Sequence, residues 1–242
     1  MSNKNMRCFP LEEKIMKDKK FNDGVFAYFQ IKSYIDKDGN KFIYAKDAKA
    51  DVILKALSTA EDGSSKKSIS KRTIENNISL FKKLNIIEKG TTEDNYGKEV
   101  DVLFIKEEFE KFQYIPYETL KFLFDASNSN VIKIYAYLLN AYKLKIMNKS
   151  NEKYVFTLKE LYEAIGYRQR SENKEMMDNI LLTLTNNGLI KYVEYYELNK
   201  KGVPTPKHKL IEVSTEVKGM KKQKQKTNKI AKVVDAEGHF KF

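Results

Sequence analysis

The stretch from Ser68 to Ile105 constrains the fold of this chain more than any other part of the sequence. Its first half carries apolar residues at a spacing of three and four, namely Ile74, Ile78, Phe81 and Leu84. Polar residues fall roughly opposite them, namely Arg72, Asn76, Ser79 and Lys83. Because an α-helix turns once every three to four residues, each set lines one face. The pattern predicts an amphipathic helix whose outer face can form hydrogen bonds.

A β-hairpin is predicted directly after this helix. Ile86 and Ile87 begin a short strand, residues 90–98 are rich in turn formers, and the alternation over 100–105 is typical of a returning strand. Before the helix, the sequence predicts a strand over 41–45 and a helix over 47–58 that Asp47 caps. The predicted inner face of that helix contains Val52, Ile53, Ala56 and Leu57. The order strand, helix, helix and hairpin is that of a winged-helix domain.

The second of these helices has side chains that suit the recognition of double-stranded DNA. Arginine and asparagine carry paired groups that match the edges of guanine and adenine in the major groove. Lys71 and Arg72 stand at the helix start, where docked recognition helices usually touch DNA. The candidate DNA-binding residues of this domain are Lys66, Lys67, Ser70, Lys71, Arg72, Thr73, Asn76, Ser79, Lys83 and Lys98. An ordinary surface helix with a solvated polar face would show the same pattern, and this alternative stays open.

The second half of the chain repeats the plan. It predicts a short extended segment over 112–116 and helices over 117–124 and 131–147. A strand over 153–156 leads to a capping box at Thr157 and Glu160, a further helix capped by Ser171, and strands over 189–198 and 207–213. At an offset of about 103 residues, Ile74, Phe81 and Ile87 match Met177, Leu184 and Ile190. The repeat predicts a second winged-helix domain.

The expected fold class is therefore α+β and mainly helical, with two tandem winged-helix domains and a basic, disordered C-terminal tail. The expected divisions are an N-terminal arm over 1–23, the first domain over 24–111, the second over 112–216 and the tail over 217–242. The formal net charge is +12, and the tail contributes seven lysines without an acid between Val217 and Val234. Its candidate phosphate contacts are Lys221, Lys222, Lys224 and Lys226. Such a tail strengthens binding without selecting sequence, or it serves only as a solubilising end.

The second domain offers candidate DNA contacts at Arg168, Gln169, Arg170, Lys174, Asn179, Lys200, Lys201 and Lys207. Its predicted recognition helix, however, carries Glu172, Glu175 and Asp178, and acids beside phosphates weaken binding. Leu182 is expected to be exposed on this helix, and an outward leucine often marks a protein contact. We therefore expect the first domain to read bases, whereas the second mediates dimerisation or grips the DNA backbone.

Catalytic and metal sites find little support. The single cysteine, Cys8, excludes an internal disulfide and a multi-cysteine metal site, and neither His208 nor His239 has a matching nucleophile or ligand cluster. A calcium-loop register beginning at Asp36 fails, because Lys41 occupies the position that requires glycine. There is no apolar run of membrane-spanning length and no signal peptide. The expectation is a soluble, cytoplasmic protein that is not an enzyme and takes no cofactor or metal.

Three segments, YIPYETLKFLFDASNSNVIKIYAYLLNAY, FTLKELYEAIGY and ILLTLTNNGLIKYVEYY, resemble a known family. It comprises the tandem winged-helix replication initiators of plasmids and phages from Gram-positive bacteria. The resemblance covers residues 112–198 best and 41–105 more loosely. It implies an intracellular protein that binds double-stranded DNA sites on its own replicon, often as a homodimer. The expected task is initiation of replication at repeats in its origin, with host replication proteins as further expected partners. A transcriptional regulator of a mobile element, and a replisome or partition adaptor that binds protein through its winged helices, are the alternatives.

Overall fold

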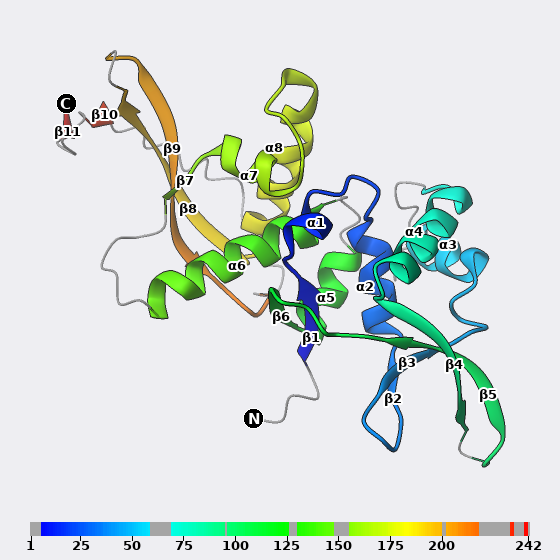
Figure 1. The fold of residues 1–242 in the computed structure, drawn as a ribbon. Coiled ribbons are helices and arrows are strands. Elements are labelled where there is room, and N and C mark those ends of the chain that lie inside the picture. The colour runs from blue at the N-terminus through cyan, green and yellow to red at the C-terminus, as the bar shows by residue number, and fades with distance from the viewer. Residues whose placement is uncertain are drawn as a thin grey trace. The chain divides into compact units, whose positions relative to one another are not determined.

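The computed structural model describes residues 6–58, 69–94, 96–125, 130–147, 155–199, 202–217, 233–234 and 240–241. The chain divides into two compact units, Met1–Ile132 and Lys133–Phe242 (Figure 1). Both are mixtures of helices and mainly antiparallel strands, as expected for an α+β protein.

The described helices of the first unit are α1 (Glu13–Met16), α2 (Asp23–Ile31), α3 (Ala50–Ser58), α4 (Lys71–Lys83) and α5 (Tyr117–Asp125). Its described strands are β1 (Met6–Pro10), β2 (Tyr34–Ile35), β3 (Lys41–Tyr44), β4 (Ile87–Glu93), β5 (Glu99–Ile105) and β6 (Phe112–Pro116). The predicted helix over 47–58 begins only at Ala50, because the backbone N–H groups of Asp47 and Ala48 both donate to the Tyr44 carbonyl in a turn. Val52 is 40% exposed rather than inward.

A four-stranded antiparallel sheet in the order β2-β3-β5-β4 lies beside α2, α3 and α4 (Figure 1). The short strand β3 reaches only residues 102–104 of β5. By contrast, β4 pairs with β5 along its whole length, from Ile87 opposite Ile105 to Glu93 opposite Glu99. The β4–β5 hairpin therefore extends beyond β3 as a two-stranded projection.

The core of the first unit is aromatic and is centred on α4. Phe81 is fully buried, and its ring lies 5.3 Å from that of Phe21, 6.0 Å from that of Phe26 and 5.8 Å from that of Phe29. Ile74, two helical turns before Phe81 on α4, is also fully buried. The predicted apolar face of α4 is confirmed at these two positions, and packing against α2 explains why it is apolar.

The boundary between the units differs from the expected one. β1 pairs antiparallel with β6, so that Met6 lies opposite Pro116 and Pro10 opposite Phe112. The next helix, α5, packs on α2, where the rings of Phe124 and Tyr28 lie 6.5 Å apart. Residues 112–132 consequently belong to the first unit, and the segment 1–23 is not only an arm, because it supplies β1 and α1. The physical reason is strand pairing across about 100 residues, which local patterns do not reveal.

A buried carboxylate of the first unit, that of Asp23, accepts hydrogen bonds from the backbone near residue 131. Asp23 is 2% exposed, and its two oxygens accept hydrogen bonds from the backbone N–H groups of Asn130, at 3.1 Å, and Ile132, at 3.0 Å. These groups stand at the N-terminus of α6 (Val131–Met147), where the first N–H groups of a helix have no partner within it. Asp23 thus fixes the start of α6 from a position far away in sequence.

The described elements of the second unit, besides most of α6, are β7 (Val155–Phe156), α7 (Leu158–Ala164), α8 (Ser171–Asn186), β8 (Ile190–Leu198), β9 (Pro204–Val213), β10 (Val233–Val234) and β11 (Phe240–Lys241). The predicted cap of α7 is confirmed, because the Thr157 hydroxyl accepts from the Glu160 N–H at 3.1 Å. The expected cap of α8 is wrong: Arg170 occupies the N-cap without a side-chain hydrogen bond, and Ser171 is already helical.

The sheet of the second unit has the order β11-β10-β8-β9-β7. β8 and β9 form an antiparallel hairpin with an irregularity between Lys191 and Tyr192, and β7 pairs with β9 through Phe156 opposite His208. β10 runs parallel to β8, with Val233 opposite Tyr196. Part of the predicted disordered tail therefore forms strands, because the edge of β8 offers unpaired backbone groups. Residues 218–232 lie outside the described residues.

Candidate nucleic-acid interface

The outward face of α4 is the strongest candidate binding surface of the first unit. Arg72, Asn76, Ser79 and Lys83 are all exposed on it. The opposite face buries Ile74, Asn77 and Phe81, while Ile78 and Leu84 are only half-buried. Since residues four apart lie one helical turn from each other, the four exposed side chains form a single stripe along α4. The sequence located this stripe but missed the buried position of Asn77.

Two further candidates at the start of α4 are engaged locally. The Ser70 hydroxyl caps the helix by accepting from the Thr73 N–H at 3.1 Å, and the two hydroxyl oxygens lie 2.8 Å apart. Capping of this kind satisfies a helix N–H that would otherwise need water. Ser70 and Thr73 therefore serve the helix start, and α4 presents longer side chains to a ligand.

Lys71 is exposed at the start of α4 but forms an ion pair with Asp51. Its Nζ lies 2.9 Å from Oδ2 of Asp51 on α3, and this hydrogen bond raises the pKa of the lysine amine. The ion pair links α3 to α4. The pair also places the Asp51 carboxylate beside the candidate surface, where its negative charge would repel a DNA phosphate.

Replacing Asp51 with asparagine is expected to tighten DNA binding. The change removes a negative charge from the rim of the surface and leaves Lys71 free to meet a phosphate. Because exposed charges are screened by solvent, the gain should be modest, the same for all sequences, and greatest at low salt. Fluorescence anisotropy with one duplex at several salt concentrations measures the effect. Lys49→Gln, which removes an exposed cation beside the same helix, should act in the opposite direction, and unchanged affinity for D51N would contradict this role of Asp51.

The tip of the β4–β5 hairpin is built around Asp94. Its Oδ1 accepts from the backbone N–H groups of Tyr96, at 2.9 Å, and Lys98, at 3.0 Å, and Gly97 adopts the left-handed φ of 72° that the turn requires. Lys98 is exposed, as a phosphate contact would need. Tyr96 is 94% exposed at the same tip. Sequence reasoning missed it, and the turn residues around it were the available signal.

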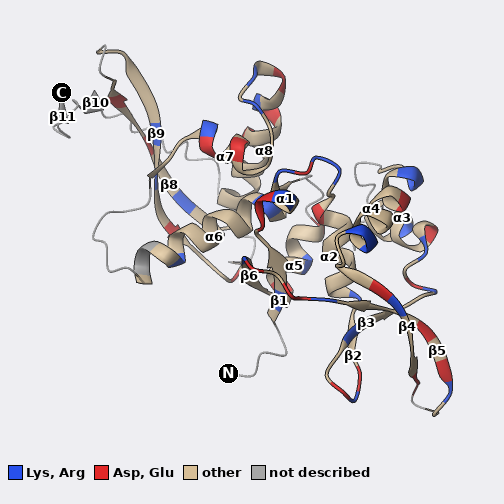
Figure 2. Cartoon of the chain, in the orientation of Figure 1, with Lys and Arg blue, Asp and Glu red and all other residues tan. Residues whose placement is uncertain are grey.

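Acids outnumber bases along this hairpin (Figure 2), where Glu88, Glu93, Asp94, Glu99 and Asp101 stand against Lys89 and Lys98. Lys37 Nζ lies 3.2 Å from Glu93, and Lys106 pairs with Glu88. The hairpin is therefore net acidic, unlike the stripe on α4, and Lys98 at its tip is the cation best placed to reach a phosphate.

In the second unit, the turn between α7 and α8 exposes Arg168, Gln169 and Arg170. Arg170 lies 3.6 Å from the Glu172 carboxylate, which offsets its charge. Lys174 and Asn179 are exposed on α8, and Lys207 is half-buried with its Nζ 3.7 Å from Glu197. The remaining candidates, Lys66, Lys67, Lys200, Lys201, Lys221, Lys222, Lys224 and Lys226, lie outside the described residues.

The outward face of α8 is acidic, in contrast to that of α4. Glu172, Glu175 and Asp178 are exposed along it, and Leu182 is 45% exposed. The buried face of the helix contains Met177, Ile180, Leu181 and Leu184. The predicted exposure of Leu182 is confirmed, and the acids disfavour an approach of this helix to phosphates.

His208 lies buried midway along the β8–β9 hairpin, opposite Glu194. Its ring stacks on Phe156 with centroids 5.2 Å apart and packs against Tyr192 at 5.5 Å, and its Nδ1 has no hydrogen-bond partner among the described residues. Burial lowers the pKa of His208, although Glu194, directly opposite on β8, acts in the other sense. The imidazole is accordingly a neutral packing element.

Lowering the pH is expected to destabilise the second unit. The folded state binds a proton at His208 less readily than the unfolded state, whose histidine has its ordinary pKa of about 6.5. The stability that the neutral ring provides is therefore complete above about pH 6.5 and is lost as the pH falls toward the lowered folded pKa. Urea midpoints measured from pH 7.5 to pH 5 should show this decline, and His208→Phe should flatten it. An equal decline in the variant would exclude His208 as the cause.

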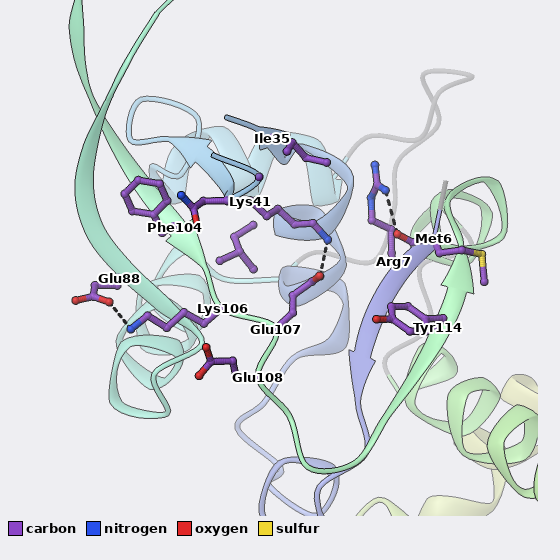
Figure 3. Close-up of a pocket in the computed structure, with 13 residues that line it drawn as sticks. Met6, Arg7, Ile35, Lys41, Glu88, Phe104, Lys106, Glu107, Glu108 and Tyr114 are labelled. Carbon is purple, nitrogen blue, oxygen red and sulfur yellow. Dashed lines mark hydrogen bonds and ion pairs between the residues drawn. The ribbon is translucent and has the colours of Figure 1, made fainter. Parts of the chain in front are cut away.

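A cavity of about 600 Å³ lies in the first unit between the end of the four-stranded sheet and the β1–β6 ribbon (Figure 3). Lys41 and Glu107 form an ion pair at 2.5 Å in it, and Lys106 pairs with Glu88. Arg7 Nε donates to the Gln30 carbonyl at 2.9 Å. Most of the charged side chains that line this cavity are thus already paired within the protein. This arrangement favours structural stability over binding of a charged ligand.

Cys8, on β1, is buried, and burial with a smaller effect of Glu107 raises the pKa of its thiol to about 12. A thiol of that pKa stays protonated and is a poor nucleophile. Within the described ranges, no group of three or more His, Cys, Asp and Glu side chains could hold a metal ion. No helix there combines the length and apolarity that crossing a bilayer demands.

Comparison with known proteins gives no family for the chain. No protein-family model matches it, and no curated protein matches it at a significant level.

Proposed function

We propose that the protein is a sequence-specific, double-stranded-DNA-binding protein made of two tandem winged-helix units, and that it initiates replication of a plasmid or phage. The observation that carries the DNA-binding part is the exposed stripe of Arg72, Asn76, Ser79 and Lys83 on α4. The helix bearing it follows α3 in the chain and precedes an antiparallel hairpin, which is the element order of a winged helix. Rigid support behind the stripe comes from the buried Ile74 and Phe81.

The proposed binding mode places α4 in the major groove. Arg72 would donate two hydrogen bonds to a guanine edge, and Asn76 would pair with an adenine edge, since these groups match in geometry. Lys83 and Lys98, from α4 and the hairpin tip, would neutralise phosphates on either side. Base contacts then set the sequence, and phosphate contacts set position and much of the affinity.

The second unit supports a division of labour. Its element order β7, α7, α8 and hairpin parallels that of the first unit, which favours a second winged helix. The acids on the outward face of α8 and the exposed Leu182 favour a protein contact at that helix. We assign base reading to the first unit and dimerisation to the second. The same observation favours the adaptor as a second candidate function, in which α8 binds a protein of the replisome or partition apparatus.

The initiator role itself rests on the resemblance of residues 112–198 to plasmid and phage initiators. In that role the bound complex would mark or open an origin and recruit host helicase-loading proteins. A transcriptional regulator would use the same surface, so the arrangement of binding sites along DNA must separate the two.

The test is selection from DNA at near-physiological salt. The full chain is incubated with a random duplex library and with fragments from around its own gene, and the retained DNA is sequenced. An enriched motif in the library supports sequence-specific binding. Tandem direct repeats of that motif beside or within the gene support an initiator, whereas single inverted repeats over promoters support a regulator.

A matched variant makes this selection specific to α4. Arg72→Ala combined with Asn76→Ala should abolish the motif, whereas Lys32→Ala, which removes an exposed cation just after α2, should retain it. Retention of DNA without any shared motif would overturn sequence-specific recognition. The adaptor function would then be the remaining proposal, and the retained DNA would be explained by non-specific contacts between lysines and phosphates.

A further inference from the structure

Asn77 is the one polar side chain among the buried residues of α4, and it is 1% exposed. Its Oδ1 accepts a hydrogen bond from the backbone N–H of Asn22 at 2.7 Å, and its Nδ2 donates to the Thr73 carbonyl at 2.9 Å. Both polar atoms of the amide are therefore used. An apolar residue would fill the same space, so the amide points to a directional requirement at this position.

The partner of this bond is itself a fixed point of the fold. Asn22 is the N-cap of α2, and its side chain accepts from the Val25 N–H at 3.0 Å. Its carbonyl accepts from the Phe26 N–H at 3.1 Å. Asn77 therefore ties the middle of α4 to the first turn of α2 through a backbone group that cannot change rotamer.

Apolar packing alone does not fix the position of α4 on α2 as narrowly as a hydrogen bond does. The neighbours of Phe81 are the rings of Phe21, Phe26 and Phe29, and such contacts have no fixed direction along the helix axis. A hydrogen bond of 2.7 Å sets both the height and the rotation of α4 at one residue. Asn76 is next to that residue and points outward, so its direction follows directly from the bond.

We infer that Asn77 is a positioning residue, which fixes the placement of α4 on α2 and thereby the aim of Arg72 and Asn76. This inference rests on the proposed function for its effect on DNA, but its structural part stands alone. Asn77 makes no contact with DNA in this scheme, and it acts through the helix.

The first measurement follows the helix itself, without DNA. Spin labels at Lys32→Cys and Lys83→Cys, in a Cys8→Ala background of the full chain, report the distance between α2 and α4. With Asn77→Leu added, the mean distance should shift by about 1–2 Å, the size of movement that packed helices make between two arrangements. Ile74→Val, a buried change on the same helix that keeps the hydrogen bond, should leave it unchanged. An unchanged distance in N77L would overturn the inference.

The second measurement uses the selected duplex and an unrelated duplex. In N77L the ratio of the two affinities should fall about tenfold, the effect of losing one base contact, while affinity for the unrelated duplex and its salt slope stay constant. A general loss of folding would lower both affinities together and would contradict a positioning role. If the wild type prefers neither duplex, the proposed function fails, and the label distances still decide the role of Asn77.

A pair of variants at Asn22 covers the case in which N77L does not fold. Asn22→Pro removes the N–H that Asn77 accepts and also the side-chain cap, whereas Asn22→Ala removes only the cap. The distance between the two spin labels should shift in N22P and stay at the wild-type value in N22A. Equal distances in the two variants would show that the bond to Asn77 does not position α4.

Discussion

Replacing Arg72 and Asn76 together with alanine is expected to remove sequence selection. Each residue offers a paired contact to a base edge, and one such contact contributes about 1–3 kcal/mol. Loss of both should weaken binding to the selected motif by on the order of 30-fold or more, because each 1.4 kcal/mol is about tenfold. Both side chains are exposed on α4, so the fold should tolerate their truncation.

Competition binding with the selected duplex and an unrelated duplex measures this loss. The affinity for the unrelated duplex should fall only slightly, because Lys83 and Lys98 remain. Lys83→Ala serves as the matched control, since it removes a phosphate contact and should weaken both duplexes alike. Undiminished preference for the selected motif in the double variant would place base reading elsewhere in the chain.

Truncation of Phe81 to alanine is expected to cause the largest loss of stability. The side chain is fully buried and contacts the rings of Phe21, Phe26 and Phe29. Large-to-small changes of this kind cost about 3–5 kcal/mol, through lost burial and the cavity left behind. The loss should appear in the unfolding transition of the first unit, and it should also weaken DNA binding because α4 loses its support.

Urea unfolding followed by circular dichroism measures the effect on the full chain. Tyr96→Ala is the matched control, because that ring is 94% exposed at the hairpin tip and its removal should change stability little. A loss below about 1 kcal/mol for F81A would contradict the central place of Phe81 in the core.

Local patterns in the sequence predicted most of the elements near the candidate site. The spacing of Ile74 and Phe81 located the buried face of α4, and the alternation before Ile105 located β5. The capping box at Thr157 located the start of α7. These features succeed because each depends on residues within one or two turns of each other, where periodicity and capping act.

The sequence by itself thus determined α4, α6, α7, the β4–β5 and β8–β9 hairpins and the exposed stripe of Arg72 and Asn76. Tertiary structure alone decided that β1 pairs with β6, that Asp23 receives the start of α6, and that Asn77 faces Asn22. In each of these cases the two partners are separated by 55 to 110 residues. A hydrogen bond between such partners depends on how the whole unit packs, and nothing in the neighbouring sequence specifies it.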